Sequence, residues 1–317
     1  MKIFDREQTC SALSFERLIP ALRDAFITQC HVPMRHVHRI EGGAQTMTSL
    51  IMPAWNEGGL MGIKTVNIAP GNSQLGKPGL HSTYLLYDAT TGEPLALIDG
   101  DEITSRRTAG ASALAASYLA REDASQLLIV GAGRVASLLA DAYAAVRPIR
   151  EVRVWNAREA SAARLVESLK NEGYEASVVT DLADAVRTAD IISCATLATE
   201  PVVLGEWLQP GSHLDLIGSF TPEMREADDA CFIDARLYID TEEALIKSGE
   251  LLGPMSRNVF KAEDVVCTLD ALAKQECKGR RSDDERTVFK SVGTALEDLA
   301  AATLVYGGYT TKTINLE

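Results

Sequence analysis

Three cationic side chains stand beside apolar runs in the first third of the chain and could bind a small anion. Arg35, Lys64 and Arg107 occur in PMRHVHR, MGIKTVN and TSRRTAG. Lys64 follows Gly62-Ile63 in a predicted buried strand, where an unpaired ammonium is costly unless an anion accompanies it. Arg107 falls in the first turn of a predicted helix, where its guanidinium and free backbone N–H groups could converge on an oxyanion. The three predict a site for a small carboxylate, with structural salt bridges as the alternative for each, because the chain is rich in acids.

The segment LLIVGAGRVASLLADAY joins an apolar strand to a helix through a glycine turn. Gly131 can make the tight turn, Gly133 lets the backbone approach a pyrophosphate, and Ala136 replaces a third glycine where helix and strand pack closely. With a strand before, a helix directly after and a second strand to follow, the pattern predicts a dinucleotide site; a purely structural turn is the alternative. Arg134 and Val135 lie inside this turn and complete the predicted cofactor-binding segment.

The end of the second strand bears on which nicotinamide dinucleotide is used. NAD enzymes usually place an acidic residue there to hold the ribose 2′-hydroxyl, but this strand reads VRVWNAR. Asn156 would not repel a 2′-phosphate, and Arg158, with Arg134, could pair with one. We therefore expect NADPH in preference to NADH, with NADH still possible. The alternative for Arg158 is a solvated residue that opens the next helix.

The elements that position these residues predict an α/β protein. Short apolar runs within 45–99, separated by turn formers, predict a mostly antiparallel sheet. From Gln126 strands and helices alternate, which predicts a Rossmann-type, doubly wound parallel sheet. Helices are expected over 11–30, from Thr104, and in the C-terminal segments ALIKSGELLG and SVGTALEDLAAATLVYG. The expected domains are residues 1–118, completed by a helix over 295–317, and residues 119–294. The five expected parallel strands read LLIV, VRVW, ASVV, IISCAT and HLDLIG.

The charge and cysteine content of the chain indicate which classes of partner and which cellular compartment to expect. The chain of 317 residues has a formal net charge of -13, which disfavours nucleic acid and anionic membranes because both repel an acidic protein. The first ten residues are too charged for a signal peptide and no apolar run is long enough to span a membrane, so we expect a cytoplasmic protein. The six cysteines lack a CxxC pair and are expected to be reduced thiols. His36 and His38 are the one close histidine pair, without other ligands at metal spacing, so no metal is expected.

Beyond these separate signals, the chain resembles the ornithine cyclodeaminase and mu-crystallin family. The matching segments are Arg35, LIMPAW, GIKTVN, HSTYLLYDATTGEPLALIDG, the RTA segment, GAGRVA and VFKSVGTALEDLAAA, which together cover most of the sequence. The resemblance implies a homodimer in which a substrate and dimerisation domain accompanies the Rossmann domain. It also implies site residues. Arg35, Lys64 and Arg107 would hold the substrate carboxylate, and Lys64 would also exchange a proton near the reacting atoms. Thr83 would also bind the substrate. Four positions match residues that border the nicotinamide half of the cofactor: Thr83, Ile217, Gly218 and Ser291. Thr196 is expected to line the same crevice, at the carboxyl ends of the parallel strands.

One departure from the family pattern indicates the reaction. Cyclodeaminases of the family carry an aspartate just after the glycine pair, where this sequence has Phe220 in IGSFTPEMRE. Phenylalanine cannot position or deprotonate an amine, whereas reduction of a ready-made cyclic ketimine does not require that carboxylate. We therefore expect an NADPH-dependent reductase that converts delta(1)-pyrroline-2-carboxylate or delta(1)-piperideine-2-carboxylate to L-proline or L-pipecolate. The GSFTPEMRE wording is also similar to that of bacterial reductases of these substrates. The alternatives are an ornithine cyclodeaminase that releases ammonia, an alanine-type dehydrogenase, and a non-enzymatic binding protein like mu-crystallin.

Overall fold

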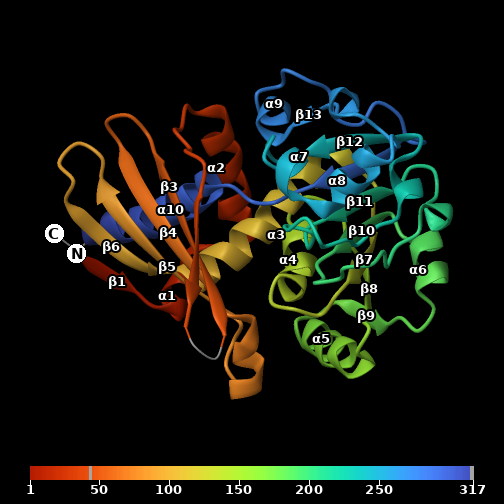
Figure 1. The fold of residues 1–317 in the computed structure, drawn as a ribbon, viewed down its shortest axis with the longest axis horizontal. Helices are drawn as coiled ribbons and strands as arrows, with labels where there is room; N and C mark the ends of the chain where they lie inside the picture. Colours follow the sequence, from red (N-terminus) through yellow and green to blue (C-terminus); the bar gives the residue numbers. More distant parts are fainter. Residues whose placement is uncertain (43–44, 315–317) are drawn as a thin grey trace. The chain divides into compact units, whose positions relative to one another are not determined.

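The computed structural model of the chain describes residues 1–42 and 45–314. The chain divides into two compact units (Figure 1). Unit 1 comprises Met1–Arg107 and the C-terminal segment from Thr294, and unit 2 comprises Thr108–Gly293. The first boundary between the two units lies after Arg107, inside helix α3 (Gly100–Leu119). The boundary predicted from the sequence, between residues 118 and 119, lies at the end of the same helix.

Unit 1 contains a six-stranded sheet in the order β1-β6-β5-β4-β3-β2. All neighbouring strands are antiparallel except β1 and β6, which are parallel. The predicted, mainly antiparallel sheet is therefore confirmed. The strands are β1 (Lys2–Phe4), β2 (His36–Glu41), β3 (Thr46–Trp55), β4 (Leu60–Ile68), β5 (Leu80–Asp88) and β6 (Pro94–Asp99).

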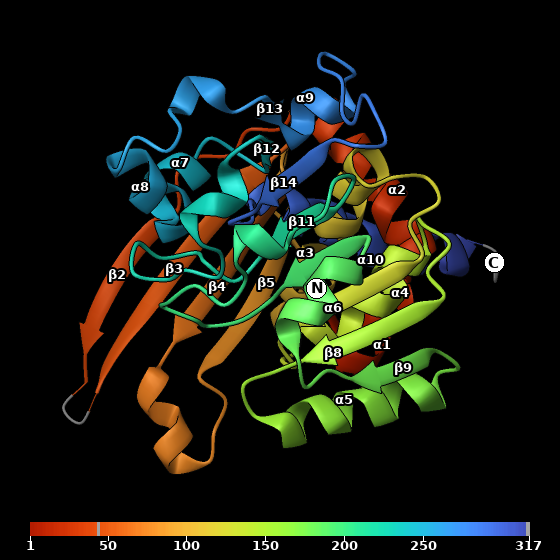
Figure 2. The ribbon, with the colours of Figure 1, turned by 90° about the vertical axis from the view of Figure 1, so that its right-hand side faces the viewer.

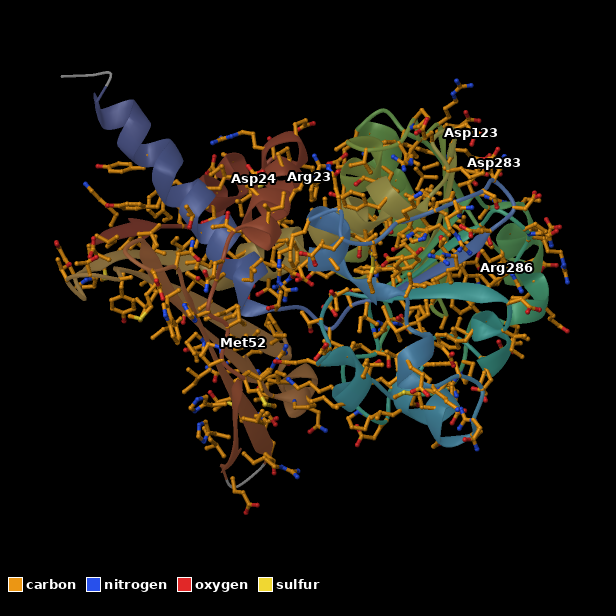
Figure 3. The ribbon with its side chains drawn as sticks, turned by 90° about the horizontal axis from the view of Figure 1, so that it is seen from above. Arg23, Asp24, Met52, Asp123, Asp283 and Arg286 are labelled. Carbon is orange, nitrogen blue, oxygen red and sulfur yellow. A yellow bond between two sulfur atoms is a disulfide. The ribbon has the colours of Figure 1, made fainter. Side chains whose placement is uncertain are left out.

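Helices α2 (Phe15–Ile27) and α10 (Ala295–Ile314) pack together, and α10 covers one face of the sheet at β3 and β4. That face carries Met52 of β3, which is 4% exposed, while the charged pair Arg23 and Asp24 lies on α2 (Figure 3). The helix expected over 11–30 is present as α2, which is shorter and begins after Ser14. The sequence did not indicate the preceding helix α1 (Arg6–Ala12), which Asp5 caps by accepting a bond from the Gln8 N–H.

Unit 2 contains an eight-stranded sheet in which every neighbouring pair is parallel, in the order β13-β12-β14-β11-β10-β7-β8-β9 (Figure 2). The central order β9-β8-β7-β10-β11 is that of a Rossmann-type sheet, so the predicted fold class is confirmed. The five expected strands are β7 (Gln126–Val130), β8 (Glu151–Trp155), β9 (Glu175–Val178), β10 (Ile191–Cys194) and β11 (His213–Leu216). The sequence did not indicate β12 (Ala235–Ile239), β13 (Cys267–Thr268) or β14 (Arg286–Lys290), which are short; β14 begins and ends with a charged residue.

The sequence predicted that the glycine turn leads directly into an α-helix, but it does not. It continues through a 3-10 turn, Ala136–Leu138, before the short helix α4 (Leu139–Ala144) begins. The other helices of unit 2 are α5 (Glu159–Asn171), α6 (Leu182–Thr188), α7 (Ala244–Lys247), α8 (Gly249–Ser256) and α9 (Leu269–Ala273).

The expectation of six reduced cysteines is wrong for one pair. Cys267 and Cys277 form a disulfide with a Cα–Cα distance of 6.7 Å, because β13 and the end of α9 bring together cysteines that are ten residues apart. The other four cysteines are free thiols. In the described ranges, no helix combines the length and apolar character needed to cross a membrane. The cytoplasmic location stays a prediction.

Candidate active site

The turn after β7 has the geometry that its glycines require. Gly131 has φ +122° and donates its N–H to the Trp155 carbonyl at 2.8 Å. A Cβ at Gly131 would lie 2.6 Å from the Ala195 oxygen, so a larger residue would be both strained and crowded. At Gly133 an added Cβ would meet no atom within 4 Å, and the exposed backbone there leaves room for a phosphate group. Ala136 is fully buried, as expected of the residue that packs helix against strand.

Beside this turn, the side chains at the end of β8 are polar or cationic. The Asn156 side chain donates to the Arg158 carbonyl at 3.0 Å, and Arg158 is exposed directly before α5. Arg134 is also exposed, and Val135 is half-buried in the turn. Because these segments carry glycines and cations rather than an acid, they fit the phosphates of a nicotinamide dinucleotide.

The remaining predicted cofactor positions come together at the carboxyl ends of β10, β11 and β14. The Ile217 N–H donates to the Cys194 carbonyl at 2.9 Å, and the Ser291 N–H donates to the Leu216 carbonyl at 3.3 Å. Thr196 and Gly218 follow the ends of β10 and β11, which are neighbours in the sheet. Ligands of doubly wound sheets bind at this edge, so the structure places Thr196, Ile217, Gly218 and Ser291 where a dinucleotide would be expected.

A buried glutamate that sequence reasoning missed ties two of these segments together. One carboxylate oxygen of Glu226 accepts the Thr196 N–H at 2.6 Å and the Thr196 hydroxyl at 2.8 Å, and the other accepts the Gly218 N–H at 2.6 Å. Glu226 is fully buried, and burial raises its pKa. The GSFTPEMRE motif contains this residue, but its spacing does not reveal which backbone groups it binds.

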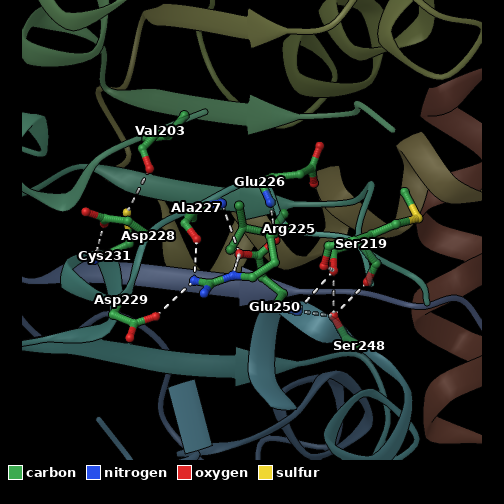
Figure 4. Close-up of polar contacts among 12 residues, drawn as sticks. Val203, Ser219, Arg225, Glu226, Ala227, Asp228, Asp229, Cys231, Ser248 and Glu250 are labelled. Atoms are coloured by element: carbon green, nitrogen blue, oxygen red, sulfur yellow. Dashed lines mark hydrogen bonds and ion pairs between the residues drawn. The ribbon is translucent and has the colours of Figure 1, made fainter. Parts of the chain in front are cut away.

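A further set of buried ionisable side chains lies next to Glu226. Lys290 is fully buried and donates to the Leu216 carbonyl at 2.8 Å. The carboxylate of Glu250 accepts the N–H groups of Glu226 and Ala227 at 2.7 and 2.9 Å (Figure 4). Burial raises the pKa of Glu250 to about 7, while the positive charge of Lys290 acts in the opposite direction. Sequence reasoning missed this network because its members come from separate motifs.

The predicted cations of unit 1 gather at the start of α10. Lys64 Nζ lies 2.7 Å from Asp298 Oδ1, and Arg107 binds Asp298 Oδ1 through Nε at 3.0 Å and Glu297 Oε2 through Nη1 at 2.8 Å. Lys64 is 1% and Arg107 7% exposed. The salt-bridge alternative weighed for Lys64 and Arg107 is therefore realised in the structure. Sequence reasoning missed both carboxylates, since the helix-like pattern of TALEDLAAA gave no reason to direct them at distant cations.

Arg35 belongs to the electrostatic surroundings of Lys64. The pKa of Lys64 is lowered to about 8, and burial is the largest cause. The nearby positive charges of Arg107 and Arg35 lower it further, whereas the Asp298 carboxylate raises it. Arg35 thus lies close enough to act on Lys64, as the sequence predicted for a common site. Asp298 Oδ2 is buried without a hydrogen-bond partner among the described residues.

Thr83 lies on the other face of the sheet. Lys64 is paired with Tyr84 across β4 and β5, whereas Thr83 is paired with Thr65 and Asp99. Because paired residues share a face and adjacent residues alternate, the structure does not bring the Thr83 side chain to the Lys64 cluster. Tyr84, which the sequence did not single out, is 1% exposed on the Lys64 face.

Phe220 follows β11 in an exposed position. Its side chain is 41% exposed, and its N–H donates to the Gly218 carbonyl at 3.0 Å. The position at which cyclodeaminases are expected to carry an aspartate thus presents an aromatic ring next to a predicted cofactor residue.

The chain is similar over most of its length to proteins of known activity or structure. The chain is 40% identical over 295 residues to the delta(1)-pyrroline-2-carboxylate reductase of Paracoccus denitrificans, covering 92% of each protein. Its fold matches the Thermococcus litoralis delta(1)-pyrroline-2-carboxylate reductase solved with NADH and L-proline, with a TM-score of 0.93, 32% identity and coverage of 99% of this chain and 98% of that one. It also matches an archaeal alanine dehydrogenase dimer with bound NAD, with a TM-score of 0.90, 32% identity and coverage of 99% and 97%. The model of the ornithine cyclodeaminase/mu-crystallin family matches residues 3–313, and the chain therefore belongs to this family.

Proposed function

We propose that the chain is an NAD(P)H-dependent oxidoreductase that reduces a cyclic ketimine carboxylate, delta(1)-pyrroline-2-carboxylate or delta(1)-piperideine-2-carboxylate, to the L-amino acid. The observation that carries this proposal is the similarity over almost the whole chain to proteins named delta(1)-pyrroline-2-carboxylate reductase. The replacement of the cyclodeaminase aspartate by Phe220 supports reduction rather than ammonia release, because no carboxylate stands at that position to handle an amine.

The cationic cluster is the proposed substrate-carboxylate site. Arg35, Lys64 and Arg107 together supply cationic donors of the kind that hold a substrate carboxylate. The bidentate geometry of arginine suits a carboxylate, and Lys64 can exchange a proton because its pKa lies near 8.

The proposed reaction adds one hydride and one proton across a C=N bond. A reduced nicotinamide, when bound, supplies the hydride that reaches C2 of the ring. The side chains of this protein hold the carboxylate, fix the orientation of C2 and keep the ring nitrogen protonated, so that the product is a secondary amine. Lys64 or Asp298, whose Oδ2 lacks a partner in the described structure, are the groups proposed to contact that nitrogen.

The proposed cofactor site comprises the glycine turn and the ends of β8, β10, β11 and β14. Gly131, Gly133, Arg134, Val135 and Ala136 would hold the pyrophosphate, and Thr196, Ile217, Gly218 and Ser291 would border the nicotinamide half. Arg158 and Asn156 support NADPH in preference to NADH, since both are exposed or half-exposed and neither repels a 2′-phosphate. The two solved relatives described above contain NADH and NAD, so the preference needs a direct measurement.

A homodimer is part of the same proposal. On the sheet face away from Lys64, the paired residues Ile3, Leu97, Leu85, Ile63 and Pro53 form an apolar row across β1, β6, β5, β4 and β3. Ile3 is 69% exposed and the other four are half-buried. A second copy would cover this row with the same residues, as two-fold symmetry requires. The solved alanine dehydrogenase relative is described as a dimer.

A substrate comparison tests the proposed activity. Purified protein is incubated with delta(1)-pyrroline-2-carboxylate or delta(1)-piperideine-2-carboxylate and either NADPH or NADH, and the amino acid product is identified. We expect consumption of reduced cofactor and formation of L-proline or L-pipecolate. Ammonia and proline from L-ornithine alone would instead make the chain a cyclodeaminase, and cofactor consumption only with pyruvate and ammonia would make it an alanine-type dehydrogenase.

A further inference from the structure

The carboxylate of Glu226 binds two segments of unit 2. It accepts the Thr196 N–H and hydroxyl on one oxygen and the Gly218 N–H on the other, and thereby joins the ends of two neighbouring strands. A Cβ at Gly218 would collide with the Thr196 carbonyl and with the Glu226 side chain. Gly131 in turn packs against Ala195 and the Thr196 methyl group. The Glu226 carboxylate therefore joins the end of β10 to the end of β11, and the glycine turn packs against the first of these two segments.

The backbone of Glu226 is itself fixed. The Glu250 carboxylate accepts the N–H groups of Glu226 and Ala227, and it also lies 3.9 Å from Arg225 Nε. Glu250 lies in the first turn of α8, whose start is capped by Ser248 (Figure 4). Lys290 supplies the nearby positive charge, since its attraction lowers the pKa of Glu226 against the effect of burial. Lys290 also precedes Ser291 and donates to the Leu216 carbonyl at 2.8 Å, so the network reaches the end of β14.

We propose that Glu226 is a positioning residue that holds Thr196 and Gly218 in place for the nicotinamide half of the cofactor, through its hydrogen bonds to both segments. The proposal rests on the proposed function, because it takes these two residues as the border of the nicotinamide half. Glu226 is fully buried and need not touch the cofactor. Its effect is carried by backbone N–H groups that a neutral amide at this position cannot all satisfy.

The variant Glu226→Gln tests the proposal, since glutamine has nearly the same size but only one acceptor oxygen. Its NH₂ group would face an N–H of Thr196 or Gly218, so one segment would move. Binding is measured with NADPH, with NADH and with ADP-ribose, which has the adenosine and pyrophosphate of NADH but no nicotinamide ring. We expect the Kd for the reduced dinucleotide to rise about tenfold, as loss of a hydrogen bond to a charged group predicts, with less than about a twofold change for ADP-ribose.

A matched control exists at the opposite edge of the same sheet. The Asp190 carboxylate accepts the N–H groups of Ser125 and Gln126 at 2.8 and 3.0 Å, at the amino end of β7. Asp123 precedes β7, Asp283 precedes β14 and Arg286 is the first residue of β14 (Figure 3). Asp190→Asn removes a comparable backbone clamp, so it should lower the Tm without changing the ratio of the two Kd values.

A smaller change keeps the test informative if Glu226→Gln does not fold. Thr196→Val removes only the hydroxyl bond at 2.8 Å and should raise the Kd for the reduced dinucleotide severalfold with ADP-ribose binding unchanged. A folded Glu226→Gln protein with wild-type affinity for the reduced dinucleotide, or with equal losses for both ligands, would overturn the positioning role. Failure of the wild type to bind either NADPH or NADH would instead overturn the proposed function.

Discussion

Lys64 and Asp298 form a buried ion pair, with 2.7 Å between Nζ and Oδ1, although 234 residues separate them in the chain. The pair joins β4 to the first turn of α10 and includes Arg107, which binds the same oxygen. Buried charges that are paired in this way contribute little to net stability compared with apolar packing, but removing one partner is expensive. Retention of this buried ionic cluster is therefore better explained by ligand binding than by stability alone.

The pKa of Lys64, about 8, predicts how activity depends on pH. Below that value Lys64 is charged and the cluster attracts a carboxylate; as pH rises through it, the ammonium loses its proton and the attraction weakens. We expect kcat/KM for the ketimine to fall above about pH 8. Asp298 raises the pKa of Lys64, so Asp298→Asn should move the fall to lower pH by about one unit.

The comparison is made between wild type and variant with the same substrate, because the ketimine nitrogen also titrates and its contribution is common to both. Asp123→Asn, at an 82% exposed side chain in unit 2, is the control and should leave the profile unchanged. An alkaline limb at the same pH in wild type and Asp298→Asn would show that Lys64 does not control it.

A double substitution separates the structural role of Lys64 from its role in binding. Lys64→Met leaves Asp298 as a buried carboxylate with one cationic partner fewer, and should reduce the free energy of unfolding by about 3 kcal/mol. Adding Asp298→Asn removes the uncompensated charge and should restore most of that stability, measured by denaturant unfolding. If Lys64 binds substrate, the double variant stays at least about a hundredfold below the single variant Asp298→Asn in kcat/KM.

Recovery of both stability and activity in the double variant would assign Lys64 a structural role only. Loss of activity without loss of stability in Lys64→Met would also be informative, since it would mean that Asp298 is protonated or reaches another cation.

The sequence predicted most of the fold because periodicity and turn residues act locally. The apolar runs of β3 to β6 and the alternation of β7 to β11 are visible in the residues themselves. β14 was missed although it lies in the middle of the parallel sheet, between β11 and β12. Its five residues, RTVFK, contain an arginine and a lysine, and only the tertiary structure shows that Lys290 is buried.

The candidate site was predicted less completely, for a related reason. Arg35, Lys64 and Arg107 could be selected as cations in apolar surroundings, but nothing local indicates that Glu297 and Asp298 would be their partners. Glu226 and Glu250 likewise bind backbone N–H groups of other segments, which leave no pattern in the sequence. Helix boundaries at Leu13 and the disulfide at Cys267 also depend on contacts that a linear reading does not contain.

Arg158 gives a prediction for cofactor preference. If its exposed guanidinium binds the 2′-phosphate of NADPH, Arg158→Ala should raise the KM for NADPH about tenfold and change that for NADH less than about twofold. Arg164→Ala, on α5 with a bond to the Ser161 hydroxyl, is the control and should change neither constant. Equal KM values for NADPH in wild type and Arg158→Ala would remove the argument for NADPH.

The apolar row on the outer sheet face predicts the state of association. Leu85 lies at its centre, between Ile63 and Leu97, and is half-buried in the single chain. In the proposed dimer the same row of a second copy covers it, so Leu85→Glu would bury a carboxylate without a partner and should shift the protein from dimer to monomer. Analytical ultracentrifugation measures the shift, and far-UV circular dichroism checks that the variant is folded. Ile246→Glu, at a 61% exposed side chain in unit 2, is the control for an added surface charge and should remain dimeric. A wild-type protein that sediments as a monomer at all concentrations would rule out this use of the sheet face, whereas a Leu85→Glu protein that stays dimeric would place the interface elsewhere.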